Sequence, residues 1–277
     1  MPALGQMIDN LGAELVNCRD GCSGIWHDQV IGVIPRSLFL ERPAATARGC
    51  LAVGLNPSRS SESERRFYRD VELTYDRVRE YRLKGYCGHR LINDIPYFGR
   101  TRTVIEQLGL HGPILWSNLA KCENQKDRKD LPPIQTLRHC TQRFLKRELD
   151  VCPPEWIVLG IGWEAFRTVA YLVPERGVIG IPHPTGGFRD FRKLLSNGIL
   201  LEDLKKRALH AMRLNEPEAV WLGGGKEGAE QSAARGLAPT SLPPAGERPC
   251  SAASTDPSRN SHWNITIHYP PIRTDSK

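Results

Sequence analysis

Four short apolar runs constrain the fold of this chain more than any other feature of its sequence. They carry almost no charge, end in glycine, proline or a polar residue, and occupy residues 51–54, 114–118, 155–160 and 178–181. Such runs are typical of strands buried on both faces of a sheet. Helical patterns alternate with them. We therefore expect an α/β fold of three αβα layers around a central, mostly parallel sheet of four strands.

The first run leads into the sequence Gly-Leu-Asn-Pro-Ser. Gly54 permits a sharp turn out of the strand, and Pro57 prevents further strand pairing. These residues place Asn56 just beyond the carboxyl end of a central strand, which is where ligands bind in open α/β sheets. Asn-Pro and Gly are also common in ordinary turns, and the segment alone favours that simpler interpretation.

Two other strand ends carry polar side chains. Asn118 closes the second run, and His183 follows the fourth run between Pro182 and Pro184. Two flanking prolines restrict the backbone, and a fixed imidazole at a strand end can donate a hydrogen bond to developing negative charge. A purely structural turn histidine is the alternative.

An aromatic turn, Pro96-Tyr97-Phe98-Gly99, precedes a helical pattern that includes Val104, Ile105 and Leu108. Such a turn can present a ring to a ligand. A buried hydrophobic staple at the start of the helix is the alternative.

The charge of the chain fits a polyanionic partner such as nucleic acid, and solubility alone is the alternative. The net charge is +7, and residues 1–214 hold 32 Lys and Arg against 24 Asp and Glu. Arginines alternate with aromatic residues in residues 59–94, which suits phosphate contact and base stacking. A solvated helix with an aromatic inner face fits that segment equally well.

We expect one domain over residues 1–214, monomeric and cytoplasmic. No apolar run is long enough to span a membrane, and the first residues do not resemble a signal peptide. From residue 215 to 277, Gly, Ala, Ser and Pro dominate, so we expect a disordered tail.

The chain has eight cysteines, and two of them form a close pair. Cys18 and Cys22 lie close together around a glycine, and Cys122 and Cys140 are 18 positions apart. The close pair could bind one metal or cluster, or be two unrelated thiols. Cys50 lies in an expected strand, and Cys87 and Cys152 have no partner at ligand spacing, so we expect all three to be ordinary buried or surface thiols.

Over about residues 10–205, these segments resemble the uracil-DNA glycosylase superfamily, most closely the iron–sulfur families 4 and 5. Gly54–Ser58 is similar to the first motif of the superfamily, and Pro96–Gly99 is similar to its Pro-Phe-x-Gly segment. Asn118–Cys122 is similar to Asn-x-x-Lys-Cys, and His183–Thr185 to His-Pro-Ser. The order and combination of these motifs carry the resemblance.

The resemblance implies excision of uracil, and of other deaminated bases as further candidates, from DNA. It implies that Asn56 orients the attacking water and that His183 stabilises the negative charge on the departing base. A flipped base in such enzymes is held by stacking and by hydrogen bonds to its edge.

The resemblance also implies which residues bind the substrate. Tyr97 is the aligned stacking ring, with Phe98 as the alternative, and Asn118 would read the edge of the base. Gly54 and Leu55 would line the same site.

For the cysteines, the resemblance implies a [4Fe–4S] cluster bound by Cys18, Cys22, Cys122 and Cys140. A zinc ion in the same four thiols is the alternative.

Three positions depart from the family pattern. Three residues instead of two separate Cys18 from Cys22, Leu55 stands where family 4 has an acidic residue, and Thr185-Gly186-Gly187 replaces a Ser-Pro run. A catalytically weak protein that binds DNA or RNA through the same groove is therefore the second hypothesis.

Overall fold

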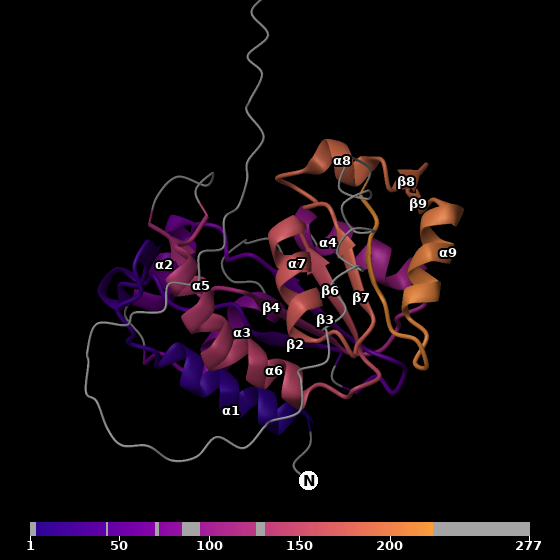
Figure 1. Ribbon diagram of the computed structural model, residues 1–277. Helices are drawn as coiled ribbons and strands as arrows, with labels where there is room; N and C mark the ends of the chain where they lie inside the picture. The colour runs from indigo at the N-terminus through magenta and orange to yellow at the C-terminus, as the bar shows by residue number, and fades with distance from the viewer. Residues whose placement is uncertain (1–3, 43, 70–71, 85–94, 126–130, 224–277) are drawn as a thin grey trace, which may run out of the picture. The chain divides into compact units, whose positions relative to one another are not determined.

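The computed structural model describes residues 4–42, 44–69, 72–84, 95–125 and 131–223 (Figure 1). Cys87, Cys250 and nearly all of the expected tail lie outside the described residues. No helix in the described part of the chain is both long and apolar enough to cross a bilayer.

A six-stranded mixed sheet forms the centre of the fold, in the order β10-β7-β6-β3-β4-β2. The strands from β10 to β4 are parallel, and β2 pairs antiparallel to β4. The six strands are β2 (Phe39–Glu41), β3 (Cys50–Gly54), β4 (Ile114–Asn118), β6 (Ile157–Ile161), β7 (Val178–Ile181) and β10 (Ala219–Trp221).

The expected count of four strands is wrong, because one further strand pairs with each edge of the predicted four. The four apolar runs form the four inner strands, whereas β2 and β10 are edge strands of three residues each. Three residues are too few to show the alternation of apolar and polar side chains by which a strand is recognised. Strand β10 also lies beyond residue 214, where we expected the domain to end.

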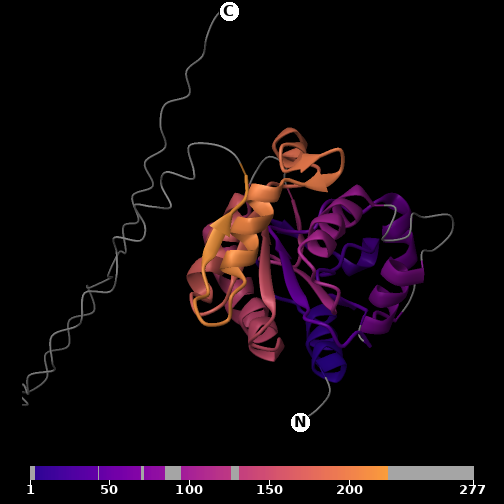
Figure 2. The same ribbon diagram turned by 90° about the vertical axis from the view of Figure 1, so that its right-hand side faces the viewer.

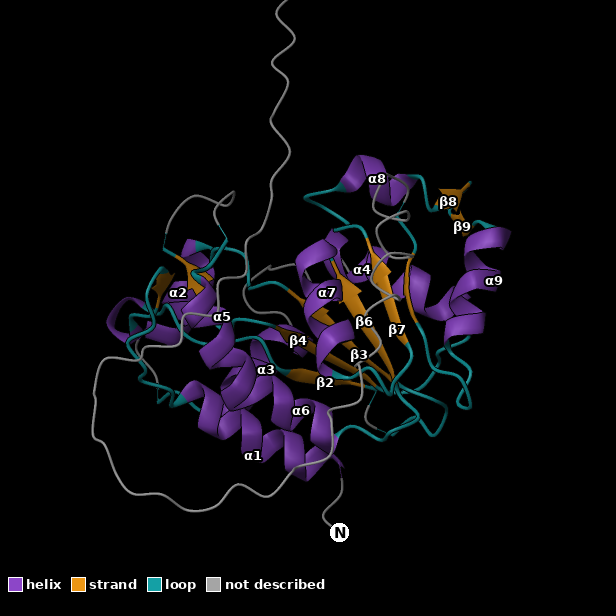
Figure 3. Ribbon diagram, in the orientation of Figure 1, coloured by secondary structure: helices purple, strands orange, loops and turns teal. Residues whose placement is uncertain are grey.

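Helices cover both faces of the sheet, so the fold has three layers (Figure 3). On one face, side chains such as Leu51 and Val53 pack against α1 (Leu4–Val16), α6 (Lys146–Val151) and α7 (Trp163–Leu172). On the other face, Cys50 and Ala52 pack against α4 (Pro96–Gln107) and α9 (Glu202–Ala211). Figure 2 shows β10 and α9 together at one edge of the sheet.

The remaining elements are short. They are β1 (Ile25–Trp26), a 3₁₀ turn (Gln29–Ile31), α2 (Glu62–Arg69), α3 (Tyr75–Lys84), β5 (Glu123–Asn124), α5 (Ile134–Cys140), a π-helical turn (Thr141–Leu145), α8 (Phe188–Arg192), β8 (Leu195–Ser196) and β9 (Ile199–Leu200). Strand β1 pairs antiparallel to β5, which joins the N-terminal segment to the residues that follow β4.

The aromatic residues of α2 and α3 face the core. Phe67, Tyr68 and Tyr75 are buried in the cluster on the α1 side of the sheet, and the Arg77 guanidinium lies 4.8 Å from the Phe67 ring. This arrangement matches the second interpretation of that segment, a helix with an aromatic inner face. Residues 85–94 lie outside the described part.

Gly160→Ala tests the packing of α7 on the sheet. A Cβ atom at Gly160 would lie 2.4 Å from the Phe166 Cα, so the whole helix must shift. We expect a loss of about 2 kcal/mol in the free energy of unfolding, measured by urea denaturation. The control is Gly5→Ala in α1, where no atom lies within 4 Å of the new methyl group. An equal stability of both variants would contradict this packing.

Candidate functional site

Gly54 and Asn118 lie side by side at the ends of two neighbouring strands. Strands β3 and β4 are parallel, and their register pairs Gly54 with Asn118. A Cβ atom at Gly54 would lie 2.4 Å from the Asn118 Oδ1 atom and 2.7 Å from the Tyr97 hydroxyl. The missing side chain of Gly54 therefore makes room for an amide and a phenol directly above the main chain.

Tyr97 reaches this place from the start of α4 and also contacts His183. Pro96 opens the helix, and the centroids of the Tyr97 and His183 rings are 5.3 Å apart at a tilt of 45°. Arg100, one turn later, donates from Nη1 to the Pro184 carbonyl oxygen (2.7 Å). This bond joins the first turn of α4 to the loop that holds His183.

The four residues Gly54, Tyr97, Asn118 and His183 therefore converge from β3, α4, β4 and the loop after β7. We call them the strand-end site. Phe98, the alternative ring, packs edge-on to Trp116 at 4.8 Å and to Phe39 at 5.7 Å. Phe98 thus packs in an aromatic cluster with Phe39 and Trp116, and Tyr97 is the ring beside His183.

The backbone around His183 determines its tautomer. Its Nδ1 atom accepts hydrogen bonds from the main-chain N–H of Gly186 (2.8 Å) and of Thr185 (3.3 Å). A neutral imidazole with an accepting Nδ1 carries its proton on Nε2. Burial lowers the pKa of His183 below its usual value, which favours this neutral form. The side chain is thus a neutral hydrogen-bond donor.

Asn56 and Leu55 follow Gly54 but differ in what they contact. Leu55 packs against the hydrophobic core on the α1 side of the sheet. Asn56 is half-buried, and its Nδ2 donates to the Pro57 carbonyl oxygen (3.1 Å) within the same loop. In the described part of the chain no hydrogen bond joins Asn56 to Asn118 or His183, so it is a neighbour of the strand-end site and not one of its contacts.

The four cysteines expected to bind a metal centre lie together, and we call them the thiol centre. Burial raises the pKa of Cys122, and the charges of Cys140, Cys18 and Cys22 raise it further. The pKa of Cys140 is likewise raised by burial and, less strongly, by Cys22 and Cys18. Because charge interactions fade with distance, these mutual effects put the four thiols in the same region of the fold.

Three contacts hold the N-terminal cysteines against the other two. Strand β1 pairs with β5, which begins one residue after Cys122. Thr136 in α5 donates from Oγ1 to the Ser23 carbonyl oxygen (2.7 Å). Asp20, between Cys18 and Cys22, is bound by His139 Nε2 (2.7 Å) and by Arg143. These two bonds lower the pKa of Asp20 to about 2.

Four thiols are a ligand set that both iron–sulfur clusters and zinc use, so the thiol centre is a candidate metal site. Buried thiols with raised pKa values need a cation to lose their protons, and main-chain donors such as the Lys121 N–H (3.4 Å to Cys140 Sγ) suit thiolate ligands. Among the described residues, no three His, Cys, Asp or Glu side chains could hold one metal ion. The thiols of a four-iron cube each bind a different iron and need not converge on one point.

Cys50 and Cys152 differ from these four. Burial raises the pKa of Cys50 to about 12, and Cys152 is affected by Arg176, Glu148 and Cys50 but by none of the thiol centre. Both are free thiols packed in the core.

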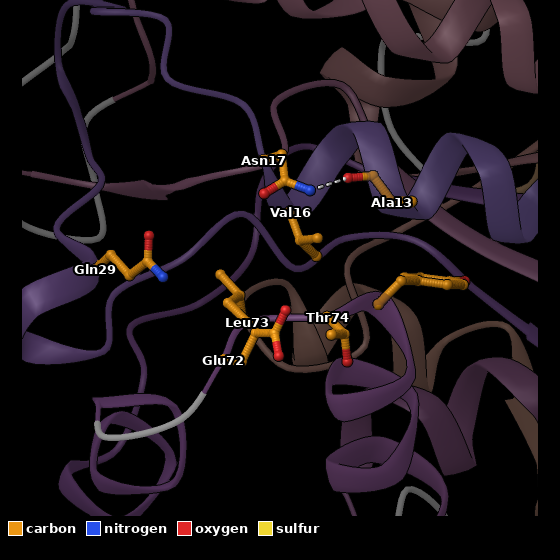
Figure 4. Close-up of a pocket in the computed structure, with 8 residues that line it drawn as sticks. Ala13, Val16, Asn17, Gln29, Glu72, Leu73 and Thr74 are labelled. Atoms are coloured by element: carbon orange, nitrogen blue, oxygen red, sulfur yellow. Dashed lines mark hydrogen bonds between the residues drawn. The ribbon is translucent and has the colours of Figure 1, made fainter.

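A separate pocket of about 360 Å³ lies between α1 and residues 72–75 (Figure 4). Its lining includes Val16, Asn17, Leu73 and Tyr75, and no residue of the strand-end site. None of the side chains that converge at the strand ends lines it, so we place the candidate site at the strand ends and not here.

Several residues that hold these sites were missed from the sequence. Lys121 and Glu148 form a buried ion pair beside Asn118, and Arg36 pairs with Glu123. Distant partners of this kind have no fixed spacing. The one available signal was Lys121 itself, a lysine one position before Cys122.

No protein-family model matches the chain, and no curated protein sequence is significantly similar to it. The site geometry therefore carries the functional argument.

Cys122→Ser and Cys152→Ser form a matched pair for the thiol centre, since both cysteines are buried. We expect the Cys122 variant, purified without oxygen, to lose most of its bound metal, because one of four ligands is gone. The Cys152 variant should keep the metal content of the unaltered chain, measured by elemental analysis. Equal metal loss in both variants, or no metal in the unaltered chain, would contradict a metal site here.

Proposed function

We propose that this protein is a DNA glycosylase that hydrolyses the N-glycosidic bond of uracil, with other deaminated bases as further candidates. The observation that carries the proposal is the convergence of Asn118 and Tyr97 over Gly54, with His183 against the Tyr97 ring. A stacking ring, an amide and a neutral hydrogen-bond donor are what an extruded pyrimidine needs in one place.

Each side chain has a distinct task in this proposal. Asn118 offers a paired donor and acceptor that match the edge of uracil. The Tyr97 ring stacks on the base, and burial raises the pKa of its hydroxyl, so the phenol stays protonated. His183 donates a hydrogen bond from its Nε2–H to the uracil oxygen on which negative charge builds.

In this proposal, cleavage of the glycosidic bond needs one further participant, a positioned water molecule. The C1′–N1 bond breaks, its electron pair leaves with the uracil anion, and the sugar becomes cation-like. A water molecule oriented by Asn56 adds to C1′ and gives up a proton to solvent. Leu55 packs into the core, so no acidic side chain stands at the neighbouring position.

DNA is the proposed partner, and basic residues near His183 suit its phosphates. Arg189 and Lys193 on and after α8 follow the His183 loop within a few residues, and the Arg189 side chain is 90% exposed. Phosphate contacts of this kind position a duplex without reading its sequence.

A [4Fe–4S] cluster is the proposed occupant of the thiol centre, where it would tie the N-terminal segment to α5. Zinc in the same four cysteines is the alternative, and it requires the thiols to move closer together, because no three of them can hold one ion as the described residues stand. A brown colour with broad visible absorbance in freshly purified protein favours the cluster, whereas a colourless protein that contains zinc favours the ion.

A second candidate is a catalytically weak protein that binds nucleic acid through the same surface. The packing of Leu55 favours it, because family 4 has an acidic residue at that position. Tight binding of uracil-containing DNA without release of free uracil would select this candidate.

The direct test uses oligonucleotides that contain one uracil, single-stranded or opposite guanine. Incubation followed by alkali should break the strand at the uracil. Asn56→Ala with His183→Ala should reduce breakage to background, because both the water and the leaving group lose their support. Cys152→Ser is the control for a substitution outside the site. If the unaltered protein breaks no more strands than the double variant does, the proposal is contradicted.

The pH dependence of uracil release follows from the tautomer of His183. Its lowered pKa keeps it neutral at and above about pH 7. Protonation at lower pH turns Nδ1 into a donor facing the Gly186 N–H, which breaks that hydrogen bond. We expect kcat/KM to be constant from about pH 7 to 9 and to fall in acid.

His183→Gln is the control for this pH profile. It should be slow at every pH and should lack the decrease in acid that His183 causes. The same acid decrease in this variant would contradict the assignment to His183.

A further inference from the structure

Lys121 is buried, and its ammonium group has four oxygen partners. Nζ lies 2.7 Å and 2.9 Å from the two carboxylate oxygens of Glu148, and the two side chains are 1% and 0% exposed. The same Nζ donates to Ser117 Oγ (2.6 Å) and to the Asn118 carbonyl oxygen (2.7 Å). Ser117 Oγ also donates to Glu148.

The bond to Asn118 falls where the main chain leaves the strand. Asn118 is the last residue of β4, and the next two amides, of Leu119 and Ala120, donate to the carbonyl oxygens of Gly54 and Leu55 (both 2.9 Å). The Lys121 ammonium therefore fixes the peptide that carries the Asn118 side chain, at the point where that side chain leans over Gly54.

The main chain of Lys121 makes the second connection. Its N–H donates to Cys140 Sγ (3.4 Å), and the next residue is Cys122. Glu148 lies in α6, which continues through the π-helical turn from α5, the helix that ends at Cys140. Both partners of the ion pair are thus attached to segments that carry the thiol centre.

A buried ion pair of this kind adds little to stability. Replacing such a pair by apolar side chains of similar volume is often neutral or stabilising, since both charges must be desolvated on folding. A better explanation of this cluster is the geometry that the ion pair imposes on Asn118.

We propose that Lys121 is a positioning residue that links the thiol centre to the amide of Asn118. Its ammonium, supported by Glu148 and Ser117, fixes the Asn118 peptide, and its N–H bonds to a sulfur of the thiol centre. The inference rests on the proposed function for what Asn118 does, but the linkage itself is independent of catalysis.

The test is the double variant Lys121→Met with Glu148→Leu, which removes both charges and keeps the volume. We expect kcat/KM for uracil release to fall about 100-fold, as expected for a displaced recognition group. Affinity for undamaged DNA and metal content should not change. Hydrogen exchange of the Leu119 and Ala120 amides should become faster.

The matched control is Glu14→Ala with Arg147→Ala, a half-exposed pair that joins α1 to the residue before Glu148. It should leave kcat/KM and the exchange of both amides unchanged. If the apolar double variant does not fold, Ser117→Ala replaces it, with a smaller change in the same direction.

Unchanged exchange at Leu119 and Ala120 in a folded variant that retains its metal would overturn the proposal. So would a decrease in kcat/KM that accompanies an equal loss of metal, because the effect would then be on the thiol centre alone. If the unaltered protein releases no uracil, the proposed function fails, and the exchange measurement still decides the linkage.

Discussion

The short run from Asn118 to Asn124 is the part of the chain on which both candidate sites depend. It begins with the amide above Gly54, passes through Lys121 and Cys122, and ends in the strand that pairs with β1. The run is almost entirely buried, so each of its polar groups must find a partner inside the protein. Two of those partners belong to the candidate sites: the Leu119 N–H donates to the Gly54 carbonyl oxygen, and the Lys121 N–H donates to Cys140 Sγ.

Glu123 is also buried, and its carboxylate finds partners that belong to or contact the loop that holds Asn56. Its carboxylate accepts from the Ser60 N–H (2.6 Å) and pairs with Arg36 (2.8 Å), a fully buried arginine. Arg36 also donates to the Ser58 carbonyl oxygen and pairs with Glu64. Buried ion pairs cost desolvation energy, so we interpret this network as one that fixes the geometry of the loop.

The inner sheet and the strand-end residues could be predicted because their signals are local. Apolar runs give the four inner strands, and the glycine and polar residues that end them give Gly54, Asn118 and His183. The edge strands β2 and β10 could not be predicted, because three residues are too few to show an alternation of apolar and polar side chains. The ion pair of Lys121 with Glu148 and the contacts of Asp20 join residues far apart in sequence, and only the folded chain brings such partners together.

The most direct measurement of the central claim is a titration of the isotope-labelled protein with free uracil, followed by NMR. The account predicts that the side-chain amide of Asn118, the main-chain amide of Gly54 and the ring of His183 shift together with a single binding constant. Shifts confined to Val16 and Leu73, which line the separate pocket, or no shifts in any of these groups, would contradict it.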